Sequence, residues 1–295
     1  MNQRNWPQPA INSLQNWLKT ARSQLEPVSD AATLEAHMLA SFVLAHPRSW
    51  LMAHSDTLIA AGELEILNSH LQKLVDGYPF AYITGEREFF GRKFAIQPGI
   101  LVPRPETELL VETALQWLAF HPSRGAVIDV GCGSGCIAVS LAAECHWVKV
   151  CAVDIFPDAV RLTQRNAVTH HVNSNVLCLV GDLISAFNTK FDLICANLPY
   201  IPTRLLNGLA VTRFEPALAL DGGENGLQII DRLLKQAIQL ISPGGLILLE
   251  IESSLGENSQ QLALQYFPKS EVRLVRDLAD HPRLIIIQSR WENSF

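Results

Sequence analysis

Four consecutive residues, Asn197-Leu198-Pro199-Tyr200, carry the most specific chemistry in this chain of 295 residues. They follow the largely apolar run 191–196, which has the composition of a buried strand. At the end of a parallel strand, they would bring an amide side chain, a backbone carbonyl and an aromatic ring into one small pocket. Two acceptors can bind the two N–H bonds of a planar –NH2 group. The pattern therefore predicts a pocket that holds a planar nitrogen while a methyl group is delivered to it.

Each residue of the tetrapeptide is expected to have its own role toward the substrate amide. A carboxamide nitrogen is a poor nucleophile, because its lone pair is delocalised into the carbonyl. The Asn197 side-chain oxygen and the Leu198 backbone carbonyl would orient that nitrogen and support the developing positive charge. Tyr200 would pack flat against the amide, and Pro199 completes the set of four candidate catalytic residues. No strong general base is evident, and none is required if the proton leaves after methyl transfer.

A glycine loop lies upstream, where Gly131-Cys132-Gly133-Ser134-Gly135 follows the apolar run 126–130. Glycine lets the backbone turn sharply and approach a ligand without a Cβ in the way. The G-x-G-x-G spacing differs from the G-x-G-x-x-G fingerprint of dinucleotide-binding proteins, which disfavours NAD. The alternative interpretation of such a loop is a simple tight turn.

Carboxylates end the next two apolar runs. Asp154 would accept hydrogen bonds from both ribose hydroxyls of a nucleoside. Asp182, with Leu183 beside it, would accept a hydrogen bond from an adenine amino group. Together with the glycine loop and Asn197, these residues predict an S-adenosylmethionine site at the carboxyl ends of successive strands, where open α/β sheets bind ligands.

Strand and helix patterns alternate from residue 126 onward. The apolar runs are 126–130, 149–153, 176–180, 193–196 and 246–251. Such alternation predicts an α/β fold with a doubly wound, mostly parallel, Rossmann-like sheet. Residues 271–275 and 284–287 are expected to add an antiparallel edge.

The preceding residues predict two further parts. Residues 1–77 carry helical apolar stripes and no strand-like run, which predicts a small helical bundle. Residues 78–104 are rich in aromatic residues bounded by glycines, which predicts a β-hairpin linker. We expect residues 105–295 to form the catalytic domain, which opens with a helix through about residue 119.

Composition excludes several classes of protein. The net charge of −6 disfavours a nucleic-acid groove. The sequence contains no run of about 18 apolar residues, so we expect no membrane span. Residues 1–6 lack the apolar core of a signal peptide. The six cysteines form no C-x-x-C pair. We therefore expect a cytoplasmic protein with reduced, buried cysteines and no metal site.

Five blocks of sequence resemble the PrmC/HemK family of release factor glutamine methyltransferases: 77–85, 101–108, the glycine loop, the Asn-x-Pro-Tyr tetrapeptide and 215–223. The resemblance implies an N-terminal helical domain that recognises the substrate, a hairpin linker and a class I methyltransferase domain. It implies methyl transfer from S-adenosylmethionine to the glutamine N5 of the Gly-Gly-Gln motif in peptide chain release factors. The Pro-Glu-Thr-Glu segment at 105–108 favours these enzymes over their relatives that modify a ribosomal protein.

Leu198 is the one departure within the tetrapeptide, since the family usually has a proline there. Its carbonyl remains available, and the following Pro199 biases it to an extended conformation. Three alternatives stay open: a ribosomal protein glutamine methyltransferase, a DNA adenine N6-methyltransferase that flips its base, and a non-catalytic binding module. The block 215–223 is interpreted as a pocket wall, with a plain turn as the alternative.

Overall fold

The computed structural model describes residues 12–290 and separates into two compact units, with the division between Thr84 and Gly85. Residues 1–11 lie outside the described residues, and they include residues 1–6, on which the signal-peptide expectation rests. No helix within residues 12–290 has the length and apolar character needed to cross a membrane.

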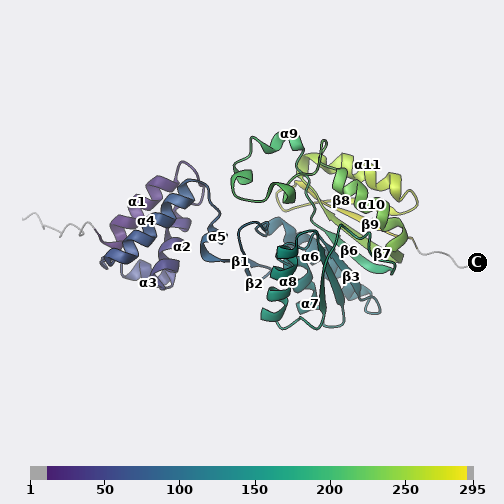
Figure 1. Ribbon diagram of the computed structural model, residues 1–295, viewed down its shortest axis with the longest axis horizontal. Helices are drawn as coiled ribbons and strands as arrows, with labels where there is room; N and C mark the ends of the chain where they lie inside the picture. The colour runs from purple at the N-terminus through teal and green to yellow at the C-terminus, as the bar shows by residue number, and fades with distance from the viewer. Residues whose placement is uncertain (1–11, 291–295) are drawn as a thin grey trace, which may run out of the picture. The chain divides into compact units, whose positions relative to one another are not determined.

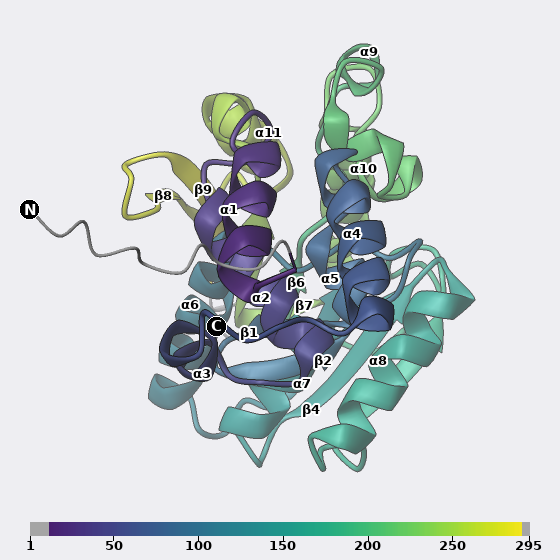
Figure 2. The same cartoon turned by 90° about the vertical axis from the view of Figure 1, so that its left-hand side faces the viewer.

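The N-terminal unit is built only of helices over its described residues (Figures 1 and 2). They are α1 Leu14–Leu25, α2 Ala32–Leu44, α3 Arg48–Ala53, α4 Ala61–Val75 and α5 Phe80–Thr84. Their apolar stripes meet in one core around Leu14, Leu39 and Leu67, which are fully buried. The unit extends past the predicted boundary at residue 77, because Phe80 and Ile83 of α5 pack against this core.

The second unit begins with a hairpin of β1 Glu86–Phe89 and β2 Arg92–Ala95. Phe90 and Gly91 both have positive φ, 50° and 68°, as a tight two-residue hairpin turn requires. Asn166 of α8 (Pro157–Thr169) accepts a hydrogen bond from Ala95 N at 2.9 Å and donates one to Ala95 O at 3.1 Å. The residues predicted as a linker thus include a hairpin that is fixed to the second unit.

A seven-stranded sheet with the order β5-β4-β3-β6-β7-β9-β8 forms the centre of this unit (Figure 1). The strands are β3 Ala126–Val130, β4 Lys149–Asp154, β5 Val176–Val180, β6 Phe191–Ala196, β7 Ile241–Glu250, β8 Glu271–Arg276 and β9 Pro282–Gln288. The first five in the sheet order are parallel, while β9 and β8 form an antiparallel edge. The predicted α/β fold is confirmed.

Helices cover both faces of the sheet, which explains its nearly continuous apolar strands. One face carries α6 Glu108–Phe120, α7 Cys136–Glu144 and α8, and the other carries α10 Gln228–Leu240 and α11 Gly256–Tyr266 (Figure 1). A 3₁₀ turn, Pro105–Thr107, precedes α6, as the proline and acidic residues there predict.

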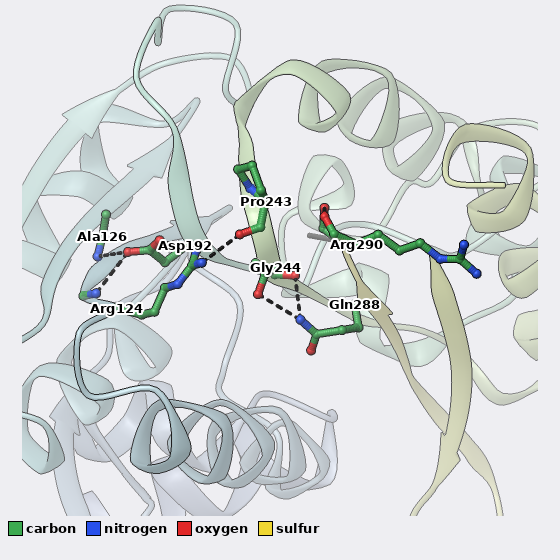
Figure 3. A network of polar contacts seen from close by, with 10 residues as sticks. Arg124, Ala126, Asp192, Pro243, Gly244, Gln288 and Arg290 are labelled. Atoms are coloured by element: carbon green, nitrogen blue, oxygen red, sulfur yellow. Dashed lines mark hydrogen bonds and ion pairs between the residues drawn. The ribbon is translucent and has the colours of Figure 1, made fainter. Parts of the chain in front are cut away.

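A polar network closes the amino end of the sheet (Figure 3). Arg124 donates to Asp192 Oδ1 at 2.9 Å and to the Pro243 carbonyl at 2.8 Å. Asp192 Oδ2 accepts hydrogen bonds from the N–H groups of Gly125 and Ala126, both at 3.1 Å. The carboxylate therefore joins the starts of β3, β6 and β7 at the end of the sheet opposite to the predicted site.

Candidate active site

The strand register brings the predicted site residues together at the carboxyl end of the sheet. Paired residues of parallel strands lie side by side, and the pairs here are Val130↔Val153, Val130↔Ala196 and Ala196↔Leu249. The residues that follow them are Gly131, Asp154, Asn197 and Glu250, which we call the strand-end row. The chain reverses its strand order between β3 and β6, and open α/β sheets bind ligands at such a point.

A cavity of about 450 Å³ opens at Gly131, Asp154 and Asn197 of this row. Eight of the predicted residues line it: Gly131, Gly133, Asp154, Asp182, Leu183, Asn197, Leu198 and Pro199. Its apolar walls include Ile100, Leu101, Ile155, Phe156 and Ala159. These wall residues come from loops and from the start of α8, and the sequence analysis assigned none of them to the site.

The glycine loop has the conformation that only glycine adopts without strain. Gly131, Gly133 and Gly135 have φ of 76°, 55° and 81°. A Cβ on Gly131 would lie 3.0 Å from Leu198 Cδ2, and one on Gly135 would lie 2.7 Å from Thr163 Cγ2. Gly131 and Gly133 thus bring backbone without a side chain to the cavity lining, shortly before α7.

The Asp154 carboxylate is tied to the loops on both sides of the cavity. Oδ2 accepts a hydrogen bond from Gly133 N and Oδ1 accepts one from Phe156 N, both at 2.9 Å. Burial raises the pKa of Asp154, and these backbone hydrogen bonds oppose that rise. A carboxylate has about four acceptor positions, and the backbone N–H groups of Gly133, Ile155 and Phe156 use only part of them, so the carboxylate can still accept from a hydroxyl group of a ligand.

Asp182 has a partner that the sequence did not predict. Its Oδ2 accepts a hydrogen bond from Arg232 of α10 at 2.5 Å, and both side chains are about half-exposed. Both residues line the cavity. The predicted contact of Asp182 with an adenine amino group stays a prediction, in which the ligand would share the carboxylate with Arg232.

Four predicted site residues lie outside the cavity lining: Cys132, Ser134, Gly135 and Tyr200. Thr163 Oγ1 donates to Cys132 Sγ at 3.3 Å, and burial raises the pKa of that thiol. The Ser134 carbonyl accepts a hydrogen bond from Asn166 at 2.8 Å. The two side chains are almost fully buried, and their predicted contact with a cofactor stays a prediction.

The Asn197 amide has a defined orientation. Its Nδ2 donates to Thr107 Oγ1 at 3.1 Å, and Glu250 lies beside it in the strand-end row. Thr107 and Glu250 are each 2% exposed. Sequence reasoning missed both, although Glu250 is the single carboxylate in the apolar run 246–251.

The backbone after the tetrapeptide is held by a second strand-like segment. Ile201 N donates to Leu220 O at 2.9 Å, and Gly222 N donates to Ile201 O at 2.8 Å. A Cβ on Gly222 would lie 2.7 Å from Tyr200 Cα. Burial, followed by the nearby Glu250 charge, raises the pKa of Tyr200 to about 12, so its phenol is neutral at physiological pH.

The block 215–223 forms a wall of the cavity. Pro216, Leu218, Ala219, Asp221 and Gly223 line it. Glu215, which is 4% exposed, anchors the block by accepting a hydrogen bond from Arg104 at 2.6 Å. Of the two interpretations of this block, the structure shows the pocket wall.

The six cysteines are free, with five buried and Cys178 partly exposed. Among residues 12–290, no group of three or more His, Cys, Asp or Glu side chains is arranged to hold a metal ion.

Solved methyltransferases share the fold of this chain. A methyltransferase from Pyrococcus furiosus is 18% identical and has a TM-score of 0.52, with 76% of this chain and 98% of that chain covered. The T. thermophilus 16S rRNA N2 G1207 methyltransferase, solved with AdoMet and guanosine, is 19% identical and has a TM-score of 0.51, with coverage of 70% and 50%.

Family models and curated relatives cover both units. Residues 16–85 match the PrmC N-terminal domain, and residues 105–214 match the methyltransferase small domain. The release factor glutamine methyltransferase of Koribacter versatilis is 37% identical over 86% of this chain and 90% of the relative. The enzyme of that name from Escherichia coli K12 is 36% identical, with coverage of 92% and 97%. The chain therefore belongs to the release factor glutamine methyltransferase family.

Proposed function

We propose that this protein transfers a methyl group from S-adenosylmethionine to the side-chain amide nitrogen of the glutamine in the Gly-Gly-Gln motif of peptide chain release factors. The observation that carries the proposal is the orientation of Asn197. Its Nδ2 donates to Thr107, which leaves Oδ1 as a free acceptor at the edge of the cavity. Membership of the family supports the choice of a glutamine amide as the group that Asn197 holds.

The residues of the cavity fit the proposed cofactor. A volume of about 450 Å³ falls in the range of small-molecule sites. Gly131 and Gly133 would let a ligand lie against the backbone, Asp154 would accept its ribose hydroxyls, and Asp182 would accept its adenine amino group. When bound, S-adenosylmethionine supplies an electrophilic methyl group.

Two acceptors of the tetrapeptide act on the substrate amide. Asn197 Oδ1 and the Leu198 carbonyl accept its two N–H bonds and hold the nitrogen in one orientation. They also support the positive charge that develops on nitrogen as the new bond forms. As the N–CH3 bond forms, the S–CH3 bond of the cofactor would break and leave a neutral thioether. The N–H of the methylated nitrogen is acidic only after the transfer, and its proton goes to water.

The helical N-terminal unit would serve as the substrate-recognition domain in this proposal. Its match to the PrmC N-terminal domain supports that role. Because translation is terminated in the cytoplasm, we propose that compartment for the activity.

A methyl-transfer assay with labelled S-adenosylmethionine tests the proposed substrate. The acceptors are a release factor, its variant with alanine in place of the Gly-Gly-Gln glutamine, a ribosomal protein and duplex DNA. The proposal predicts label on the intact release factor and none on its variant. Label confined to DNA, or to the ribosomal protein, would overturn it.

A further inference from the structure

We propose that Thr107 and Glu250 are positioning residues, which fix the Asn197 amide so that its oxygen, and not its nitrogen, faces the substrate. The inference rests on the proposed function and goes beyond it, because it assigns roles to two residues outside the tetrapeptide.

The geometry places three polar side chains from three elements in one buried cluster. Asn197 follows β6, Glu250 ends β7, and Thr107 ends the 3₁₀ turn before α6. The Asn197 Nδ2 to Thr107 Oγ1 distance is 3.1 Å. At 2% exposure, neither Thr107 nor Glu250 can exchange these contacts for water.

The donors and acceptors of this cluster can be arranged in only one way while Glu250 is ionised. A carboxylate only accepts hydrogen bonds. The Glu250 carboxylate lies close enough to Thr107 and Asn197 for both to lower its pKa, and its Oε2 is buried without a hydrogen-bond partner. It is therefore an acceptor for the hydroxyl hydrogen of Thr107, whose oxygen accepts from Asn197 Nδ2. The donation runs from Asn197 through Thr107 to Glu250, and the Asn197 oxygen is left for the substrate.

The opposite orientation of the amide would disable the pocket. Asn197 Nδ2 is a donor, and the substrate –NH2 group is also a donor, so a flipped amide would bring two donors together. It would also leave the substrate N–H without its acceptor. An unmade hydrogen bond of this kind corresponds to about a 10-fold to 100-fold loss of rate.

The surroundings of Glu250 make the orientation dependent on pH. Burial raises its pKa to about 7; the Thr107 hydrogen bond and Arg283 of β9 lower it, and Glu106 raises it. Tyr200, which also faces Glu250, is neutral in this range. Below pH 7 the protonated Glu250 is itself a donor, so the direction of the hydrogen bonds is no longer fixed. Turnover should therefore rise with pH through about 7.

Three substitutions separate positioning from packing. Glu250→Gln keeps the shape but adds a donor, and Thr107→Val keeps the shape but removes the hydroxyl. Both should lower kcat at least about 10-fold, with the KM for release factor and the affinity for S-adenosylmethionine unchanged. Thr107→Ser, which restores the hydroxyl, should recover most of the loss. The rise of kcat through pH 7 should disappear in Glu250→Gln.

A second readout needs no substrate. The side-chain ¹⁵N amide signal of Asn197, followed by NMR in the full chain, should shift with a midpoint near pH 7 in the wild type and not in Glu250→Gln. Because wild-type titration alone tests this, a variant that fails to fold does not remove the test. If no release factor is methylated, the proposed function fails while this titration still decides the positioning role. Wild-type kcat in folded Glu250→Gln and Thr107→Val, or an amide signal without the titration, would overturn the inference.

Discussion

The side chain of Asn197 links the two halves of the site. Its nitrogen donates to Thr107, and the residue lines the same cavity as Gly131 and Asp154. In the proposed function, the Asn197 amide holds the methyl acceptor and Asp154 holds the ribose of the cofactor. Substitutions at Asn197 and at Asp154 should therefore affect different kinetic constants.

Asn197→Ala should reduce kcat by about 10²-fold to 10³-fold, the usual effect of removing one group that stabilises developing charge. The affinity for S-adenosylmethionine should persist, as measured by calorimetry. Asn207→Ala, at an exposed position of the same loop, is the control. Turnover equal to that of the wild type would refute the role of Asn197.

Asp154→Ala should weaken binding of S-adenosylmethionine about 10-fold to 100-fold, as expected for hydrogen bonds to a charged acceptor. Asp154→Asn should lose less, because its amide oxygen can still accept a hydrogen bond from Gly133 N or from a ribose hydroxyl. Isothermal titration calorimetry measures both. An unchanged dissociation constant in Asp154→Ala would remove the ribose assignment.

The sequence was sufficient to predict that Asn197, Asp154 and the glycines belong to one site. Each follows or ends an apolar run, and the carboxyl ends of parallel strands lie at the same edge of a sheet. It did not reveal Thr107 and Glu250, since their contact with Asn197 depends on the register of β6 and β7. The ion pair of Asp182 with Arg232 was likewise missed, because it joins the end of β5 to α10.

At the scale of elements, the apolar runs predicted five parallel strands and an antiparallel edge, which the sheet contains. β7 begins at Ile241, five residues before the apolar run that starts at 246. Its first part pairs with β6 across a register shift between Phe191 and Leu193, which composition does not encode. The hairpin of β1 and β2 was expected to be a linker, and its attachment to α8 depends on Asn166. Such long-range contacts have no local sequence signal.

The segment after the tetrapeptide gives an element-scale prediction. Gly222→Ala would place a Cβ 2.6 Å from Gly226 O and 2.7 Å from Tyr200 Cα, so the backbone of the tetrapeptide must shift. We expect a lower melting temperature and at least about a 10-fold loss of kcat, because a displaced acceptor misaligns the substrate. In the control Gly208→Ala, the new Cβ has its nearest contact at 3.7 Å, and both quantities should stay near wild type. Wild-type turnover in Gly222→Ala would show that the wall does not position the tetrapeptide.

At the scale of the whole molecule, stability and catalysis are separated between the two ends of the sheet. Asp192 accepts hydrogen bonds from Arg124, Gly125 and Ala126 at the amino end (Figure 3). Asp192→Ala would leave these donors without their acceptor, so it should lower the free energy of unfolding by about 2–4 kcal/mol. Turnover per folded molecule should be unchanged.

Chemical denaturation measures the effect of Asp192→Ala. The control Asp158→Ala removes an ion pair whose side chains are both 68% exposed, and it should change stability by less than about 1 kcal/mol. Equal stability losses in the two variants would contradict the role assigned to Asp192.

The buried carboxyl group of Asp129 should make the protein less stable as the pH rises. It is fully buried, with Oδ2 accepting from Ala138 N at 3.1 Å and Oδ1 unpaired. Burial raises its pKa from 3.8 to about 7. Between these values the folded state retains a proton that the unfolded state has lost. This contribution is therefore fully present below pH 3.8 and is lost as pH rises through about 7.

Asp129→Asn should remove this dependence, because its amide stays neutral. In the wild type, the free energy of unfolding should fall as the pH rises from about 5 to about 7.5. In Asp129→Asn this fall should be smaller by about 1–3 kcal/mol. Urea denaturation across that range measures it. Glu250→Gln, whose parent carboxyl has a pKa near 7 for the same reason, should show a change of the same sign. Parallel stability curves for wild type and Asp129→Asn would contradict the assignment.

The most direct test of the proposed activity is to locate the transferred methyl group by tandem mass spectrometry of a release factor after incubation with the protein and S-adenosylmethionine. Fragment ions should place one methyl group on the side-chain nitrogen of the Gly-Gly-Gln glutamine, and the Asn197→Ala protein should methylate a far smaller fraction of that residue in the same time. A methyl group on another residue, or an unmodified glutamine after incubation with the folded wild-type protein and cofactor, would contradict the proposal that Asn197 holds this amide for methylation.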